Sequence, residues 1–252
     1  MANEGIGVEW CIDYVKYDKV RISGNSPKLN ENLRTLIQTS YPDWSLEKVA
    51  SKVVYLPNCY DTEIFVPSEK EETHGEYHVG CFGAIRPLKN QLIQALAAIK
   101  YVETYLPGTK LVFHMNGERI ENSGANAVLK NIKSLFEKNP NHDLVLHPWL
   151  NHREFLGLLT QMDICMQVSY TETFNIVTAD TIVAGVPVVA SSEIAFVSNI
   201  FVADPNCVND MVWRMRLAEY FGWFGIWLNR MKLERQVEIA AEVWVSTNLH
   251  FT

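Results

Sequence analysis

The sequence predicts an α/β protein: a Rossmann-like parallel sheet with helices on both faces, together with a short partial α/β segment at the N-terminus. The arrangement of apolar residues along the chain leads to this prediction. From residue 77 onward, short and almost continuously apolar runs alternate with longer amphipathic stretches. Strands that are apolar on both faces are typical of parallel sheets covered by helices on both sides. Ligands of such sheets bind at the carboxyl ends of the strands, so the loops there are expected to carry the functional site.

The first part of the chain predicts an incomplete α/β segment. The elements expected there are two strands with a helix between them, at residues 18–23, 52–56 and 27–39. Pro27 suits the first turn of that helix, where the missing N–H is not needed. Residues 67–76 are polar, acidic and interrupted by Pro and Gly, which predicts a linker. We therefore assign residues 1–66 to a partial N-terminal segment.

The remaining elements alternate regularly along the chain. Strands are expected at residues 77–84, 110–115, 143–147, 163–168 and 186–190. Helices are expected between them, at residues 88–105, 122–138, 151–161 and 174–184. This order predicts a Rossmann-like domain over residues 67–220, followed by a C-terminal helix over residues 221–252.

Composition limits the function classes. The 252 residues are 48% hydrophobic, enough for a substantial core. The net charge of −7, with no cluster of Lys and Arg, argues against a nucleic-acid partner, which needs a concentrated basic surface. The five cysteines form no C-x-x-C pair, and Cys81 and Cys165 lie in apolar runs, so buried thiols in a reducing compartment are expected.

The sequence contains no recognisable targeting signal and no metal-binding motif. The N-terminus lacks the basic and apolar regions of a signal peptide, and the longest apolar runs are about half the ~20 residues of a transmembrane helix. We therefore expect a cytoplasmic protein without a transmembrane segment. His114, His147 and His152 are scattered and lack metal-ligand spacing such as H-E-x-x-H, so neither a metal nor another cofactor is expected.

The segment from Ser169 to Asp180 carries the chemistry. Glu172 lies in an expected loop, and Asp180 follows eight positions later inside an expected helix, so two carboxylates face one small volume. The backbone N–H groups of residues 174–176 are the unpaired donors of the first helical turn and favour an anion. Carboxylates that accept from sugar hydroxyls, beside N–H groups that hold a diphosphate, predict a nucleotide-sugar site.

Three segments carry a resemblance to a known family. Residues 169–180 resemble the E-x7-E region of retaining GT-B glycosyltransferases of the glycosyltransferase family 4 type, with Asp180 in place of the second Glu. Residues 56–65 resemble the family's P-N-G-V-D-x-x-x-F segment, and residues 83–90 its G-R-L-x-x-x-K-G turn. The three matches occur in the family's order. The resemblance implies transfer of a sugar from a nucleotide-diphosphate sugar to an unknown hydroxyl acceptor with retention, by the family's C-terminal donor-binding domain.

The resemblance also implies roles for individual residues. Glu172 would accept hydrogen bonds from the donor sugar, Lys89 would bind the pyrophosphate, and both would be catalytic; Asp180 would bind the ribose. The other residues expected to bind the donor are Gly83, Arg86, Ser169, Thr173, Phe174 and Asn175. Structural alternatives remain open. Glu172 could be an acid that stabilises the helix N-terminus through the helix dipole, and Lys89 could be a solvent-exposed lysine at the start of a helix, with no ligand in either case.

The sequence departs from the family pattern at several positions. Ala84 stands where the family has Arg after the turn glycine, and Arg86 offers a guanidinium two residues later. Asn175 stands where the family has Gly; Asn is also a good helix N-cap, so the helix can still begin there. Gly185 and Pro187 match the family's G-x-P turn and are expected to be structural.

The largest departure lies upstream. Only about 55 residues precede the segment at 56–65, too few for the complete N-terminal domain of the family. The acceptor half is thus expected to be mostly absent, which leaves a non-catalytic nucleotide-sugar or partner-binding module as the alternative function. A dinucleotide enzyme is disfavoured because the only G-x-G, at Gly5 and Gly7, follows no strand and lacks the third glycine.

An aromatic stretch follows residue 205. It contains Trp213, Tyr220, Phe221, Trp223, Phe224 and Trp227. Packing of a terminal helix is the favoured interpretation, from its helical periodicity. Contact with a membrane surface is the alternative, because Trp beside Arg and Lys is common at lipid interfaces. A partner chain or a second copy that completes the cleft is a further expectation for this stretch.

Overall fold

The computed structural model describes residues 2–64, 66, 70, 74–118 and 123–248. The predicted linker at residues 67–76 lies mostly outside this described part. The chain separates into two compact units, residues 1–60 with 237–252, and residues 61–236. The predicted domain limits at residues 66 and 220 stay a prediction.

The smaller unit is built around two short parallel strands. Its elements are α1 (Ala2–Val15), β1 (Ile22–Gly24), α2 (Pro27–Ser40), α3 (Leu46–Lys52) and β2 (Val53–Tyr55). Pro27 begins α2 as predicted, and the Ser26 side chain caps this helix by accepting from the Leu29 N–H. Helices α1 and α3 were not predicted. Gly5 and Gly7 lie within α1, so they do not form a phosphate-binding loop.

A buried lysine holds the loop before β1. Lys52, the last residue of α3, is buried, and its ammonium donates to the carbonyls of Tyr17, Asp18 and Val20 at 2.5, 3.1 and 3.3 Å. Beside it lies an apolar core of Val15, Ile37, Val49 and Val53. The three hydrogen bonds compensate for the removal of the charge from water.

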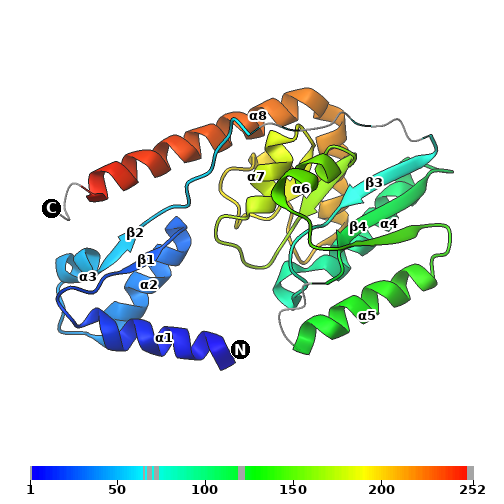
Figure 1. The fold of residues 1–252 in the computed structure, drawn as a ribbon. Coiled ribbons are helices and arrows are strands. Elements are labelled where there is room, and N and C mark those ends of the chain that lie inside the picture. Colours follow the sequence, from blue (N-terminus) through cyan, green and yellow to red (C-terminus); the bar gives the residue numbers. More distant parts are fainter. Residues whose placement is uncertain (1, 65, 67–69, 71–73, 119–122, 249–252) are drawn as a thin grey trace. The chain divides into compact units, whose positions relative to one another are not determined.

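The larger unit contains a five-stranded parallel sheet (Figure 1), with strands in the order β5-β4-β3-β6-β7. The strands are β3 (Glu76–Gly80), β4 (Lys110–Asn116), β5 (Asp143–His147), β6 (Ile164–Gln167) and β7 (Val188–Ala190). Helices α4 (Gln91–Tyr105) and α5 (Ser123–Glu137) cover one face, and α6 (His152–Leu159) and α7 (Ile176–Val183) the other. The predicted fold class is confirmed.

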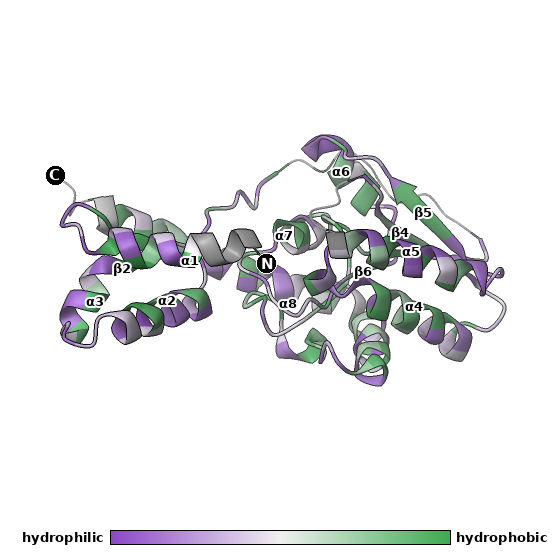
Figure 2. Ribbon diagram, turned by 90° about the horizontal axis from the view of Figure 1, so that it is seen from below, coloured by the Kyte–Doolittle hydropathy of each residue, from purple (hydrophilic) through white to green (hydrophobic). Residues whose placement is uncertain are grey.

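The sheet core is apolar, as the sequence pattern predicts. Figure 2 shows hydrophobic residues along the strands and mixed faces on α4 and α5. Cys81 and Cys165 are buried in this core, and burial raises the pKa of each thiol to about 12. Both are therefore inert thiols inside the sheet layer, as predicted.

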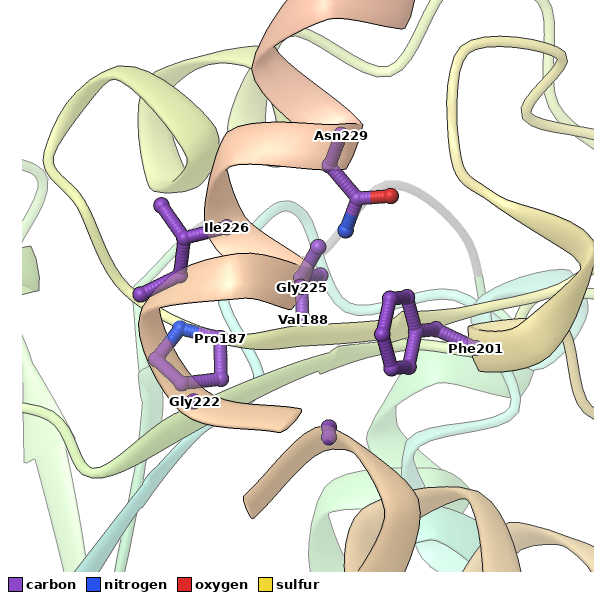
Figure 3. Close-up of a pocket in the computed structure, with 8 residues that line it drawn as sticks. Pro187, Val188, Phe201, Gly222, Gly225, Ile226 and Asn229 are labelled. Atoms are coloured by element: carbon purple, nitrogen blue, oxygen red, sulfur yellow. The ribbon is translucent and has the colours of Figure 1, made fainter. Parts of the chain in front are cut away.

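The last helix, α8 (Val208–Asn248), is broken at Gly222, whose φ of 45° and ψ of −125° are not helical. Figure 3 shows the residues beside this break, where α8 faces Phe201 and the start of β7 at Pro187 and Val188, and the space between them is too small for a water molecule. This space lies toward the amino end of β7, away from the edge where ligands of parallel sheets bind. Within the described residues, no helix is both long enough and apolar enough to cross a membrane.

The aromatic stretch of α8 is more exposed than a packed helix would be. Met211, Val212, Met215 and Ala218 make the buried face, whereas Tyr220 and Trp223 keep 77% and 78% of their surface exposed. The helix packs, as the favoured interpretation holds, through its aliphatic face and through Phe221 against Phe201, whereas Tyr220 and Trp223 lie outside that contact.

Candidate donor-binding site

The two predicted loops meet at the point where the strand order reverses. β3 leads into α4 on one face of the sheet, and its neighbour β6 leads into α7 on the other (Figure 1). The crevice outside the carboxyl ends of two such strands is the usual ligand site of an open parallel sheet. Residues 83–90 follow β3 and residues 169–175 follow β6, so both loops border this crevice.

Hydrogen bonds join the two loops directly. The backbone N–H of Tyr170 donates to the Leu88 carbonyl at 2.9 Å. The side-chain amide of Asn90 donates to the carbonyls of Val168 and Pro205 at 3.1 and 2.9 Å. The relative position of the loops is therefore fixed by one main-chain hydrogen bond and by the Asn90 side chain, which favours a preformed site.

Two buried glutamines add to this connection. Gln94 donates to the Lys89 carbonyl at 2.7 Å and accepts from the Val168 N–H at 2.8 Å. Gln167 donates to the Phe82 carbonyl at 3.0 Å and accepts from the Asn175 amide at 3.0 Å. Sequence analysis missed both residues. A polar amide at the end of an apolar strand, as at Gln167, is the signal that could have indicated one of them.

Lys89 and Glu172 form a buried ion pair between the two loops. Only 9% of the Lys89 side chain and 5% of the Glu172 side chain are exposed. The Lys89 ammonium also passes over Gly83, where a Cβ would lie 3.8 Å from it. The two residues predicted to be catalytic are thus in contact. Lys89 is buried and is therefore not a solvated residue at a helix start, and Glu172 is paired with it instead of serving only as an acid before a helix.

Two asparagines take the left-handed backbone conformation at the ends of these loops. Asn90 has a φ of 57° and Asn175 a φ of 37°. Both stand where the resembling motifs have glycine. Asn is among the few non-glycine residues that enter this region readily. At Asn90 the left-handed residue separates the short 3₁₀ turn at Pro87–Lys89 from α4, so α4 begins later than the predicted residue 88.

Asn175 caps α7, as predicted. Its side-chain oxygen accepts from the Thr178 N–H at 2.9 Å. The neighbouring Phe174 is buried against Phe196, with ring centroids 5.0 Å apart, while Thr173 and Ile176 are exposed. Ser169 is fully buried, and its hydroxyl has no hydrogen-bond partner among the described residues. A polar helix start with an unsatisfied hydroxyl nearby suits a polar ligand.

The Gly83 turn is held from the neighbouring strand. Gly83 has a φ of 112°, and its N–H donates to the side-chain oxygen of Asn116 at 2.8 Å. Asn116, the last residue of β4, was not predicted to contact the candidate site. Arg86 is half-buried at the same turn, so a guanidinium is present near the crevice although Ala84 replaces the family's arginine.

Asp180 has a partner that the sequence did not predict. It is buried in the second turn of α7, and its Oδ1 lies 2.8 Å from Nε2 of His152, the first residue of α6. Only 2% of Asp180 is exposed, whereas the His152 side chain keeps 51% of its surface. A carboxylate beside an imidazole favours the tautomer with the proton on Nε2.

The other histidines are not scattered, which corrects the sequence interpretation. His114 lies between His78 and His147, with ring nitrogens 2.9 Å apart at each contact. Burial, together with the two neighbouring imidazoles, lowers the pKa of His114 to about 3, and burial lowers the pKa of His147. The chain of rings crosses three neighbouring strands, a proximity that spacing along the sequence does not reveal.

Comparison with solved structures identifies the fold. A UDP-forming α,α-trehalose-phosphate synthase from Burkholderia xenovorans matches with a TM-score of 0.74 over 96% of this chain and 62% of its own, at 11% identity. A sucrose-phosphate synthase from Thermosynechococcus elongatus matches with a TM-score of 0.67 over 90% and 57%, at 15% identity. The larger unit has the fold of a GT-B Rossmann-like domain.

A third match is a trehalose-6-phosphate synthase described in work on glycosyltransfer with retention, with a TM-score of 0.65 over 90% of this chain and 66% of its own, at 8% identity. The chain thus spans 57 to 66% of these proteins. No protein-family model and no curated protein matches the sequence. At such low identities the likeness is one of fold.

Proposed function

We propose that this chain binds a nucleotide-diphosphate sugar in the crevice between the Gly83 turn and the loop at residues 169–175, and that it serves retaining glycosyltransfer of the glycosyltransferase family 4 type. The observation that carries this proposal is the buried Lys89–Glu172 pair. It lies at the switch point of a GT-B-type sheet and joins the two residues that the resemblance singles out. A buried ion pair contributes little to stability over an apolar pair, so a functional reason for it is favoured.

Charge complementarity supports a diphosphate ligand. The protein is acidic overall, so a diphosphate must be attracted locally. Lys89 supplies a point charge, and the first turn of α7 supplies backbone N–H donors beginning at its cap, Asn175. When a diphosphate binds, it competes with Glu172 for the Lys89 ammonium. The Glu172 carboxylate is then available to accept from the hydroxyls of the donor sugar.

The transfer step requires no nucleophile from the protein. The bond between the anomeric carbon and the diphosphate oxygen breaks, and the acceptor oxygen forms a new bond on the same face of the sugar. The acceptor's proton passes to the leaving phosphate oxygen. Lys89 and the start of α7 stabilise the negative charge that develops on the diphosphate, a contribution that grows in the transition state.

A nucleotide-sugar-binding module without transfer activity is the second candidate. In the described part of the smaller unit the sheet consists of β1 and β2 alone. An acceptor hydroxyl must be held near the anomeric carbon for transfer, and such positioning contributes roughly 7 to 11 kcal/mol. Turnover by the purified chain with sugar and lipid acceptors distinguishes the two. Donor binding with no more than slow hydrolysis would favour the module.

The proposed roles are tested by calorimetry with nucleoside diphosphates and their sugars. Lys89→Ala should weaken every ligand that carries a diphosphate, whereas the exposed Lys100→Ala, a control on α4, should not. Glu172→Gln should weaken the nucleotide sugar at least tenfold yet leave the bare diphosphate unchanged or tighter, because Lys89 loses its competing partner. Equal losses for both ligands in the Glu172 variant would contradict the assignment.

A further inference from the structure

Five aromatic side chains on α8 form one connected patch, which we call the α8 aromatic cluster. Its members are Tyr220, Phe221, Trp223, Phe224 and Trp227. Each ring contacts at least one other member, with centroids 5.5 to 6.2 Å apart. All of them except Phe221 are exposed, as is Met231 one turn beyond Trp227. A contiguous exposed apolar patch marks an interaction surface, whereas single exposed apolar residues are common on any protein.

The cluster stands on a rigid support. Phe221 packs edge to face against the buried Phe201, with ring centroids 6.1 Å apart. A Cβ at Gly225 would lie 2.7 Å from the same ring, so α8 can approach it this closely only with glycine here. The buried Asn229 side chain accepts from the Ser198 N–H at 2.8 Å. The exposed rings therefore project from a helix that is already fixed in place, and binding to a surface would order little additional structure.

The charge of this part of α8 is opposite to that of the rest of the protein. Residues 208–236, the part of α8 in the larger unit, contain five basic and three acidic side chains, a net charge of +2. Since the whole chain carries −7, the remaining residues carry −9. No acidic residue lies between Tyr220 and Leu233, whereas Arg230 and Lys232 do. An anionic surface therefore attracts this segment and repels the rest of the chain, which orients the protein.

The basic side chains beside the cluster can contact an anion. Arg216 and Arg230 each keep 44% of their side-chain surface exposed, although each is paired within the helix, to Glu219 and Glu234. Exposed pairs of this kind are weak, so lipid phosphates can replace the glutamates.

Composition and charge favour a lipid surface over a second copy of the chain. Trp and Tyr rings bordered by Arg and Lys are typical of helices that lie in the headgroup region of a bilayer. A symmetric dimer, in contrast, would place two basic strips against each other and bring together two chains that each carry −7. The same charges that oppose self-association thus favour an anionic partner.

We infer that the α8 aromatic cluster docks the protein on an anionic lipid surface, with its rings at the depth of the headgroups and the neighbouring Arg and Lys side chains on lipid phosphates. The inference does not depend on the proposed glycosyltransfer. Gly222 and Gly225 of the same helix segment face Pro187 and Val188 at the amino end of β7, whereas the donor crevice lies at the carboxyl edge of the sheet. Docking therefore does not use the loops that border the donor site.

Sedimentation of the full chain with vesicles tests the inference. The probes are vesicles of phosphatidylcholine alone and of phosphatidylcholine with added phosphatidylglycerol. The wild type should bind the anionic vesicles at least about tenfold more tightly than the neutral ones, because each basic residue near such a surface contributes about fivefold. Added salt should reduce this difference, since it screens the attraction.

Ring variants test the role of the cluster. The double change Trp223→Ala with Trp227→Ala should weaken binding to either vesicle by about tenfold or more, because two large rings no longer enter the interface. Trp149→Ala is the matched control. Trp149 is 53% exposed, close to the 48% of Trp227, but lies in the loop after β5, so this variant should bind like the wild type. If the double variant folds poorly, Trp223→Asp changes only the most exposed ring and should weaken binding as well.

A charge variant and the oligomeric state separate the alternatives. Arg230→Gln should reduce the preference for anionic vesicles about fivefold and leave binding to neutral vesicles unchanged. A wild type that binds neither vesicle, or both equally, would overturn the inference, as would a double Trp variant that binds like the wild type. A dimer seen by light scattering that the two Trp changes dissociate, without vesicle binding, would show instead that a second copy covers the cluster.

Discussion

The chain of three imidazoles should make the protein sensitive to acid. His114 has a pKa of about 3 in the folded protein and about 6.5 when unfolded. The unfolded state therefore binds more protons between these values, so stability is complete above pH 6.5 and falls as the pH decreases toward 3. The difference of about 3.5 corresponds to about 5 kcal/mol in full, of which about 2 kcal/mol is already lost at pH 5.

The groups that face His114 are known. His78 and His147 flank it, and the Glu76 carboxylate lies 3.5 Å from Nε2 of His78. Phe in place of His114 keeps a ring between the two neighbours, whose centroids are 5.1 and 5.2 Å away, but removes the titrating group. It also leaves the facing nitrogens unpaired, so the variant should be less stable at pH 7.

Urea unfolding followed by circular dichroism at pH 7, 6 and 5 measures the effect. The wild type should lose about 2 kcal/mol more than His114→Phe between pH 7 and pH 5. His74→Gln changes an exposed histidine and should retain the wild-type slope. If His114→Phe and the wild type lose stability equally on acidification, His114 is not held neutral by burial, and the explanation is wrong.

Two further predictions concern backbone and buried charge. Asn175→Ala should cost about 1 to 2 kcal/mol more than Asn175→Gly, since both variants lose the cap and the hydrogen bond to the buried Gln167 but only alanine is strained at a φ of 37°; thermal unfolding measures both, and equal costs would argue against strain. Lys52→Met should destabilise the smaller unit by about 1 to 2 kcal/mol because three partly buried carbonyls lose their donor. Limited proteolysis reports that unit, with the exposed Lys19→Met as control, and resistance equal to the control's would show that the hydrogen bonds are dispensable.

The larger unit could be predicted from sequence because its signals are local. Apolar strands alternate with amphipathic helices, and Asn175 is a good cap, so the parallel sheet and the start of α7 follow from neighbouring residues. The order of the motifs placed Lys89 and Glu172 at one edge of the sheet. Their direct contact was not predictable, because it depends on which strands are neighbours.

What sequence analysis missed depends on contacts between distant segments. His152 and Asp180 are 28 positions apart, and Asn116 reaches Gly83 across 33 positions. Neither pair has a spacing motif. Helix α1 was missed because its glycines, at residues 5 and 7, are weak helix formers. The exposure of aromatic residues of α8 such as Tyr220 and Trp223 was not predicted, because helical periodicity does not show which face of a helix meets the rest of the protein.

The most direct test of the central claim is an experimental structure of the chain with a bound nucleoside diphosphate. The account predicts the diphosphate in the crevice between residues 83–90 and 169–175, with its oxygens within hydrogen-bond distance of the Lys89 ammonium and of the first N–H groups of α7. Glu172 should then have released Lys89 at least in part. A ligand bound elsewhere, or an unchanged Lys89–Glu172 pair with no ligand between the two loops at saturating concentration, would contradict it.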